Sequence, residues 1–275
     1  MNHAAPGSAG GGVSCKGRPS HQEGPLSLFS VQTVDEPVQK PCRQHLGQEG
    51  EELVVEAYGV QRVVMSLPHG HTCDVIAFTI TSSLSGSYNA ACAAGKNCTE
   101  RNPARRIHVV DTLSAGPEIT LLLEKALSEQ SSGAGFDEVC ENLKAYQRRT
   151  HLLFALESMH NLAQNGRISR LTATMAGVLG IRAVGEASAE GTLEMLGKCR
   201  GGRKTQHFML CEMERLGYGG GSVRIGHCQN EVLAQELCSE LLHLFPQADI
   251  KSYPLRGLCS YYAERGGVIV GFETM

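Results

Sequence analysis

The chain contains no Trp, and aromatic residues make up only 5% of its 275 residues. That scarcity speaks against a platform on which the bases of a single-stranded nucleic acid stack. A basic excess is also missing, because 25 Lys and Arg residues against 28 Asp and Glu residues give a formal net charge of −3. Nucleic-acid-binding domains normally show such an excess, so we expect no nucleic-acid partner.

Long hydrophobic runs are absent as well. No apolar stretch approaches the roughly 18 residues that a membrane-spanning helix needs, and the first 20 residues lack the apolar segment of a secretory signal. We therefore expect a cytoplasmic protein that makes at most transient contact with a membrane. Its 41% hydrophobic and 19% charged residues are typical of a globular protein with an ordinary core.

The cysteines follow no recognisable framework. There are 11 of them, an odd number, and no two have the C-x-x-C spacing. A zinc ribbon and a disulfide lattice both need such spacings or pairings. We expect reduced thiols that act as small hydrophobic residues, with no metal site and no other cofactor.

The first 24 residues differ in composition from the rest of the chain. They are rich in Gly, Ser and Pro, cannot bury enough surface to fold alone, and are expected to form a disordered arm. From Asp74 onward, the apolar runs 75–80 and 107–110 predict strands buried on both faces. Polar loops and helices over 89–96, 117–130 and 136–149 follow them, which is typical of a parallel α/β sheet.

The second half alternates less regularly between strands and helices. Short strands are predicted over 181–184 and 192–198, around a turn at Glu190-Gly191. The sequence therefore predicts an α/β fold of two domains. A parallel α/β domain covers 25–158, and an α+β domain covers 159–275.

The segment after the strand 75–80 is unusually rich in hydroxyl groups. In open α/β sheets, ligands bind at the carboxyl ends of strands. There, Gly86 would let a ligand approach the backbone, and the amino end of the next helix would favour an anion. The serines could equally serve only as helix caps and turn formers. The hydroxyl-bearing side chains are Thr79, Thr81, Ser82, Ser83, Ser85 and Ser87.

Other catalytic and nucleotide-binding motifs are incomplete. A hydrolase with a nucleophile elbow needs G-x-S-x-G, whereas Ser85 lies in S-L-S-G-S. The segment 197–205 imitates a phosphate-binding loop, but Arg203 stands where Lys should directly follow Gly. These departures weaken the case for a hydrolase and for a nucleotide-binding protein.

The hydroxyl-rich segment carries a resemblance. Residues 80–88, I-T-S-S-L-S-G-S-Y, resemble the I-S-S-x-L-S-G-T-Y loop of the DegV family of fatty-acid-binding proteins. Residues 162–169, L-A-Q-N-G-R-I-S, resemble that family's L-x-x-G-G-R-I-S element. Further matches follow in family order and extend the resemblance from Asp74 to the end: Val110-Asp111-Thr112, Ser114-Ala115-Gly116, Gly180-Ile181-Arg182 and Lys198-Cys199-Arg200.

The resemblance implies a DegV-like protein of two domains that holds a long-chain fatty acid between them. The fatty acid would be its only ligand. Its carboxylate would bind in the first domain and its acyl chain in the second. Such a protein is not itself an enzyme, but a lipid-binding acyl carrier. It presents the carboxylate to a separate fatty acid kinase, which forms an acyl phosphate for phospholipid synthesis.

Transferred residue by residue, the resemblance implies that Ser85 and Gly86 bind the carboxylate, with support from Thr81 and Ser82. The apolar side chains expected to line the acyl tunnel could also form ordinary core. The arginines expected at the mouth, for a phosphate or a partner, could also form structural salt bridges. The mouth residues are Arg167 and Arg200, and the tunnel residues are Phe154, Met159, Leu171, Met175 and Leu179.

The chain also departs from the family pattern. The T-D-S-T and T-S-Q-P elements that the family carries near its amino end are absent, and residues 256–260 replace its H-x-G-P-G element. The competing hypothesis is a serine or cysteine hydrolase, or an acyl transferase, that uses Ser85 or Cys259 as nucleophile.

Overall fold

The structure is a computed structural model that describes residues 62–69, 72–168 and 180–275, with side chains from residue 74 onward. The arm predicted over 1–24 lies outside the described residues. So do Leu171, Met175 and Leu179 of the predicted tunnel.

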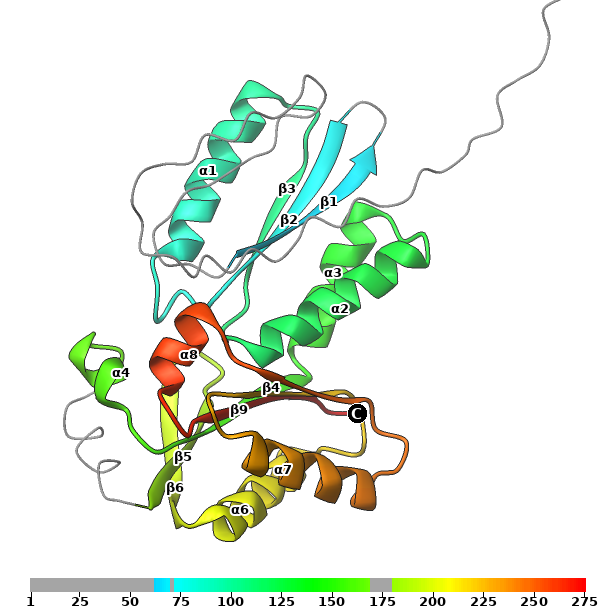
Figure 1. Ribbon diagram of the computed structural model, residues 1–275. Helices are drawn as coiled ribbons and strands as arrows, with labels where there is room; N and C mark the ends of the chain where they lie inside the picture. The colour runs from blue at the N-terminus through cyan, green and yellow to red at the C-terminus, as the bar shows by residue number, and fades with distance from the viewer. Residues whose placement is uncertain (1–61, 70–71, 169–179) are drawn as a thin grey trace, which may run out of the picture.

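The first sheet has three strands in the order β1-β2-β3. β2 (Thr72–Thr79) and β3 (Ile107–Asp111) run parallel, as the two apolar runs predict, whereas β1 (Arg62–His69) is antiparallel to β2. Helix α1 (Ser87–Arg101) covers one face, with Gly95 packed on Ile107 and Val109. Helices α2 (Pro117–Ser131) and α3 (Phe136–Gln147) cover the other face (Figure 1). These elements form the first lobe.

The second sheet has six strands in the order β6-β5-β4-β9-β7-β8. Only β7 and β8 are parallel, and every other neighbouring pair is antiparallel, so this lobe is α+β as predicted. The strands are β4 (Thr150–Leu156), β5 (Ile181–Ala187), β6 (Leu193–Arg200), β7 (Val223–His227), β8 (Ile250–Pro254) and β9 (Val268–Glu273). The helices are α4 (His160–Gln164), α6 (Gly202–Arg215), α7 (Glu231–Leu244) and α8 (Gly257–Ala263). None of the helices in the described ranges combines the length and the apolar character that crossing a membrane requires.

Strand β4 corrects the predicted boundary between residues 158 and 159. It pairs with β5 and β9 in the middle of the second sheet, so a division after residue 158 would separate it from both partners. The second lobe therefore begins at Thr150. A strand that is buried on both faces shows no alternation of apolar and polar residues, so its sequence does not reveal the sheet to which it belongs.

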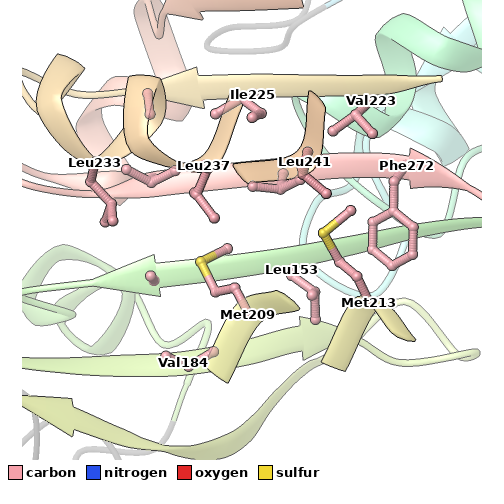
Figure 2. Close-up of a cluster of buried hydrophobic side chains, with 14 of the residues drawn as sticks. Leu153, Val184, Met209, Met213, Val223, Ile225, Leu233, Leu237, Leu241 and Phe272 are labelled. Carbon is pink, nitrogen blue, oxygen red and sulfur yellow. The ribbon is translucent and has the colours of Figure 1, made fainter. Parts of the chain in front are cut away.

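The two faces of the second sheet carry two different apolar clusters. Side chains alternate along β4, so Leu153 and Ala155 point toward α6 and α7, and Phe154 points away from them. Figure 2 shows the cluster on the α6 and α7 face. Its labelled members are Leu153, Val184, Met209, Met213, Val223, Ile225, Leu233, Leu237, Leu241 and Phe272.

Helix α2 joins the two lobes. Its apolar side chains share a cluster with β2 and β3, while its amino end packs on the second sheet (Figure 1). A Cβ atom at Gly271 of β9 would lie only 2.5 Å from the backbone nitrogen of Glu118. Arg224 of β7, 2% exposed, donates from Nε to Glu124 Oε2 of α2 at 2.8 Å and from Nη2 to Asp249 Oδ2 at 2.5 Å. Because the Arg224 side chain is buried, removing both acidic partners would leave its charge uncompensated.

Glu118 is a buried acid at this junction. It is 5% exposed, and its carboxylate accepts hydrogen bonds from Ser114 Oγ and, at 2.7 Å, from Thr150 Oγ1. Burial raises the pKa of Glu118 from 4.5 to about 7, although the two hydroxyl groups lower it in part. The folded protein thus binds this proton more tightly than the unfolded chain. Stability is therefore lost as the pH rises from about 4.5 to about 7.

We expect the Glu118→Gln variant to lose this pH dependence, because the amide resembles the protonated carboxyl group and does not titrate. Relative to wild type, its free energy of unfolding should improve by about 3 kcal/mol between pH 4.5 and pH 7.5. Urea unfolding at a series of pH values measures the difference. Glu138→Gln, at an exposed position in α3, is the control. Parallel curves for wild type and Glu118→Gln would contradict the prediction.

Candidate functional site

The hydroxyl-rich segment 81–87, here called the hydroxyl loop, lies at the carboxyl end of β2 and leads into α1. Asp111 at the end of β3 holds it there: its Oδ1 accepts from Ser82 N at 3.0 Å and from Leu113 N at 3.2 Å. Thr81 N donates to the Ser114 carbonyl at 2.9 Å. Two neighbouring parallel strands therefore carry their following loops to one place, as the sequence predicts.

Within the hydroxyl loop, Thr81 is the internal anchor. Its side chain is buried, its Oγ1 accepts from Ser83 N at 3.2 Å, and its carbonyl accepts from Leu84 N and Ser85 N, each at 3.2 Å. Ser85 Oγ accepts from Ser87 N at 3.2 Å. The loop is thus folded back on Thr81, with Ser85 in its last turn.

Gly86 itself adds no side-chain cap to the amino end of α1, where the Ser87 backbone N–H is bonded to Ser85 Oγ. The Gly86 φ of −71° is open to any residue, and an added Cβ atom would meet nothing within 4 Å. Neither the backbone nor the packing therefore requires glycine here. As the N-cap residue, Gly86 offers no side chain to the first helical turn. An exposed helix amino end carries partial positive charge and attracts anions.

The second lobe contacts the hydroxyl loop from two sides. Arg167 Nε donates to the Leu84 carbonyl at 3.2 Å, and Ser83 Oγ donates to the Glu190 carbonyl at 2.7 Å. Arg200 is not brought to the loop. It ends β6, and β6 leads away from the turn that carries Glu190 over roughly 23 Å at the usual rise per strand residue.

Phe154 and Met159 lie in one apolar cluster, on the sheet face opposite α6 and α7. They are 3% and 2% exposed. The cluster adjoins both contacts with the hydroxyl loop, because Ile168 follows Arg167 and Leu193 follows the Glu190 turn, and both pack against it. An anion-attracting loop and an apolar interior therefore meet at the interface of the lobes. The fully buried members are Leu152, Phe154, Leu156, Met159, Leu162, Ala183 and Ala263.

A cleft of about 550 Å³ lies elsewhere, between α1 and β3. Cys92, Lys96 and Ile107 are among its lining residues, and none of the residues predicted for the site lines it. Metal binding has no support in the described ranges, where no group of three or more His, Cys, Asp or Glu side chains is arranged to hold an ion.

Sequence reasoning gave no site role to Ser87 and Asp111. Ser87 is 6% exposed, and its Oγ finds no hydrogen-bond partner among the described residues. An unsatisfied buried hydroxyl is rare in proteins. Both residues could be noticed in the sequence. Ser87 ends the motif S-L-S-G-S, and Asp111 directly follows the apolar run of β3. Serine at a helix start, however, normally indicates only a cap.

The two predicted nucleophiles, Ser85 and Cys259, lie in different surroundings. Within the described residues, no His, Asp, Glu or Lys side chain hydrogen-bonds to Ser85 Oγ, which is bonded by Ser87 N instead. Cys259 lies in α8 and is 7% exposed, and an added Cβ atom at Gly116 would lie 3.1 Å from its Sγ. A serine nucleophile needs an adjacent base, and the hydrogen bonds of the described residues provide none for Ser85.

Residues 61–274 match the sequence profile of a family described as uncharacterised proteins of the DegV family. The chain belongs to the DegV family. A DegV domain-containing protein of Streptococcus pneumoniae is 46% identical over 200 residues, which cover 73% of this chain and 71% of the relative. The counterpart in Streptococcus pyogenes is 42% identical over the same shares of the two chains.

Solved structures of DegV proteins also resemble this one. A DegV family protein from Eubacterium eligens loaded with heptadecanoic acid has a TM-score of 0.72 and 41% identity, covering 74% of this chain and 73% of its own. The Streptococcus pneumoniae Fatty Acid Kinase B3 protein loaded with linoleic acid has a TM-score of 0.71 and 46% identity, covering 72% and 70%. The two-lobed α/β fold is therefore the DegV fold.

We expect Ser87→Ala and Ser114→Ala to differ in their effect on stability. Ser114 is buried and bonded to Glu118, so its loss should lower the free energy of unfolding by about 1–3 kcal/mol. Ser87 has no such bond to lose, and its replacement should leave stability unchanged or slightly higher. Urea unfolding of both variants without added ligand measures this. Equal destabilisation would show that Ser87 Oγ is paired.

Proposed function

We propose that this DegV protein binds a long-chain fatty acid and presents its carboxylate to a separate kinase. One observation carries the proposal. The hydroxyl loop, which leads into the amino end of α1, meets an apolar cluster of the second lobe at Arg167-Ile168 and at the Glu190–Leu193 segment. A charged head group and a hydrocarbon chain on one molecule fit this arrangement.

At the carboxylate end, Ser85 and Gly86 are the proposed contacts. Ser85 supplies a hydroxyl group, and Gly86 allows close approach to the amino end of α1, where the charge is favoured. Ser82 is exposed and its backbone N–H is bonded to Asp111, whereas its hydroxyl group has no hydrogen bond to any described residue. Thr81 supports the site from within the loop.

At the hydrocarbon end, burial supplies most of the affinity. A chain of a dozen methylene groups gains roughly 10 kcal/mol at about 0.8 kcal/mol each, before the costs of association are subtracted. Phe154 and Met159 are proposed to line this part of the site, whereas the other predicted tunnel residues, Leu171, Met175 and Leu179, lie outside the described residues. The related proteins from Eubacterium eligens and Streptococcus pneumoniae, loaded with heptadecanoic acid and linoleic acid, support a long-chain acid as the ligand.

The chemical step belongs to the partner in this proposal. The name of the related Fatty Acid Kinase B3 protein supports a kinase that acts on the presented carboxylate. Arg167 lies beside the hydroxyl loop, where its guanidinium group can pair with a carboxylate or a phosphate. Arg200 is exposed at the far end of β6 and is proposed as a more distant partner contact. The chain itself then needs no nucleophile and no cofactor.

The retained ligand tests this function. Mass spectrometry of an organic extract of the denatured, purified protein should detect a long-chain fatty acid in near-stoichiometric amount. Delipidated, folded protein that binds no long-chain acid would overturn the proposal. Covalent labelling of Ser85 or Cys259 by a serine- or thiol-directed probe would favour the hydrolase or acyl transferase instead.

We expect Ser85→Ala to weaken fatty-acid binding by about 1 kcal/mol or more, because a hydrogen bond to the carboxylate is lost. The affinity for a long-chain acid should fall roughly fivefold or more while the fold persists. The control is Ser239→Ala, which removes an exposed hydroxyl group bonded to the Gln235 carbonyl in α7. Unchanged affinity in Ser85→Ala would mean that the carboxylate is held elsewhere.

A further inference from the structure

The turn that joins β5 to β6, residues 188–192, reaches across to the hydroxyl loop of the other lobe. Ser83 Oγ donates to the Glu190 carbonyl at 2.7 Å, although 107 positions separate the two residues. At Gly191, an added Cβ atom would lie 2.1 Å from Thr81 Oγ1 and 3.0 Å from Leu113 Cα. The backbone of the turn is thus packed directly on the anchor of the loop.

The turn is shaped by its own hydrogen bonds. Ser188 and Thr192 close it through their hydroxyl groups at 2.8 Å and through Ser188 N to the Thr192 carbonyl at 2.8 Å. Gly191 N donates to the Ser188 carbonyl at 2.9 Å. Gly191 has a φ of +75°, a conformation that side-chain-bearing residues adopt only with strain. The turn therefore meets the loop as a preformed element.

Thr81 is hydrogen-bonded to the part of the hydroxyl loop that contains Ser85, a proposed carboxylate contact. The Thr81 carbonyl holds Ser85 N and Leu84 N, and its hydroxyl group holds Ser83 N. A displacement of Thr81 would therefore move Ser85, which Thr81 holds through the backbone. The turn acts on the same loop at Ser83, so it fixes the loop at two points.

The same turn is connected to the apolar cluster. Ala187 precedes the turn and Leu193 follows it, and both pack against the cluster that contains Phe154 and Met159. An acyl chain in that cluster would contact the strands that carry the turn. The turn 188–192 therefore connects the hydroxyl loop to the apolar cluster.

We infer that Gly191 and Ser83 are positioning residues for fatty-acid binding. The β5–β6 turn holds Thr81, and through it Ser85, in the geometry that accepts the carboxylate, and the Ser83–Glu190 hydrogen bond slows release of the bound acid. This inference rests on the proposed function. Neither residue needs to touch the ligand.

The decisive comparison is Gly191→Ala against Gly133→Ala. Both glycines have positive φ, +75° and +84°, but an added Cβ atom at Gly133 meets nothing within 4 Å. Both variants carry the backbone strain of alanine in this region, and only Gly191→Ala collides with Thr81. Dissociation of cis-parinaric acid, a fluorescent long-chain acid, should be at least about tenfold faster from Gly191→Ala, as expected for a loss of about 1.4 kcal/mol. It should be nearly unchanged for Gly133→Ala, although both melting temperatures fall.

Ser83→Ala keeps the inference testable if Gly191→Ala does not fold. It should release the probe several times faster than wild type, and Ser83→Thr, which retains the hydroxyl group, should restore slow release. A purely structural role would lower the melting temperature and leave the dissociation rate unchanged. Dissociation from Ser83→Ala at the wild-type rate, or from a folded Gly191→Ala at the rate of Gly133→Ala, would overturn the inference and leave the proposed function standing. Failure of wild type to bind any long-chain acid would overturn both.

Discussion

The packing of α2 against both sheets is the contact on which the rest of the structure depends. One side of this helix completes the apolar cluster of β2 and β3, and its amino end rests on the backbone of β9 at Gly271. The buried side chain of Arg224 adds an ionic connection from β7 to Glu124 in the middle of the helix. Because helix and sheet backbones touch without an intervening side chain, the first lobe has little freedom to slide over the second.

That fixed relation explains why the hydroxyl loop lies where it does. The loop belongs to the first lobe by sequence and by its hydrogen bonds to Asp111 and Ser114. The second lobe contacts the same loop through hydrogen bonds from Arg167 and to the Glu190 carbonyl. The hydroxyl loop belongs to the first lobe, and the apolar cluster that contains Phe154 and Met159 belongs to the second, so the proposed ligand site forms only where the two lobes meet.

The sequence predicted the parts of this arrangement that local pattern determines. Apolar runs identify β2 and β3. Because ligands bind at the carboxyl ends of parallel strands, the loop after β2, which contains Ser85, is predicted to lie at the ligand-binding edge of the sheet. The turn at Glu190-Gly191 was also predictable, since polar residues and glycine separate two short strands there. Contacts between distant segments were not. Nothing near Ser83 in the chain indicates Glu190, and the run 152–156 would be equally apolar in either sheet. The role of Gly191 depends on the position of Thr81, which only the assembled fold supplies.

The buried cysteines have a practical consequence. Cys140 lies in α3 of the first lobe, and Cys199 lies in β6 of the second lobe, both shielded from solvent. Burial raises the pKa of both thiols, to about 11 for Cys140, so we expect each to react slowly with alkylating reagents while its lobe stays folded. Alkylation of Cys140 therefore reports on opening of the first lobe, and alkylation of Cys199 reports on opening of the second. Timed alkylation followed by peptide mapping can distinguish which half opens first, without the introduction of any foreign label.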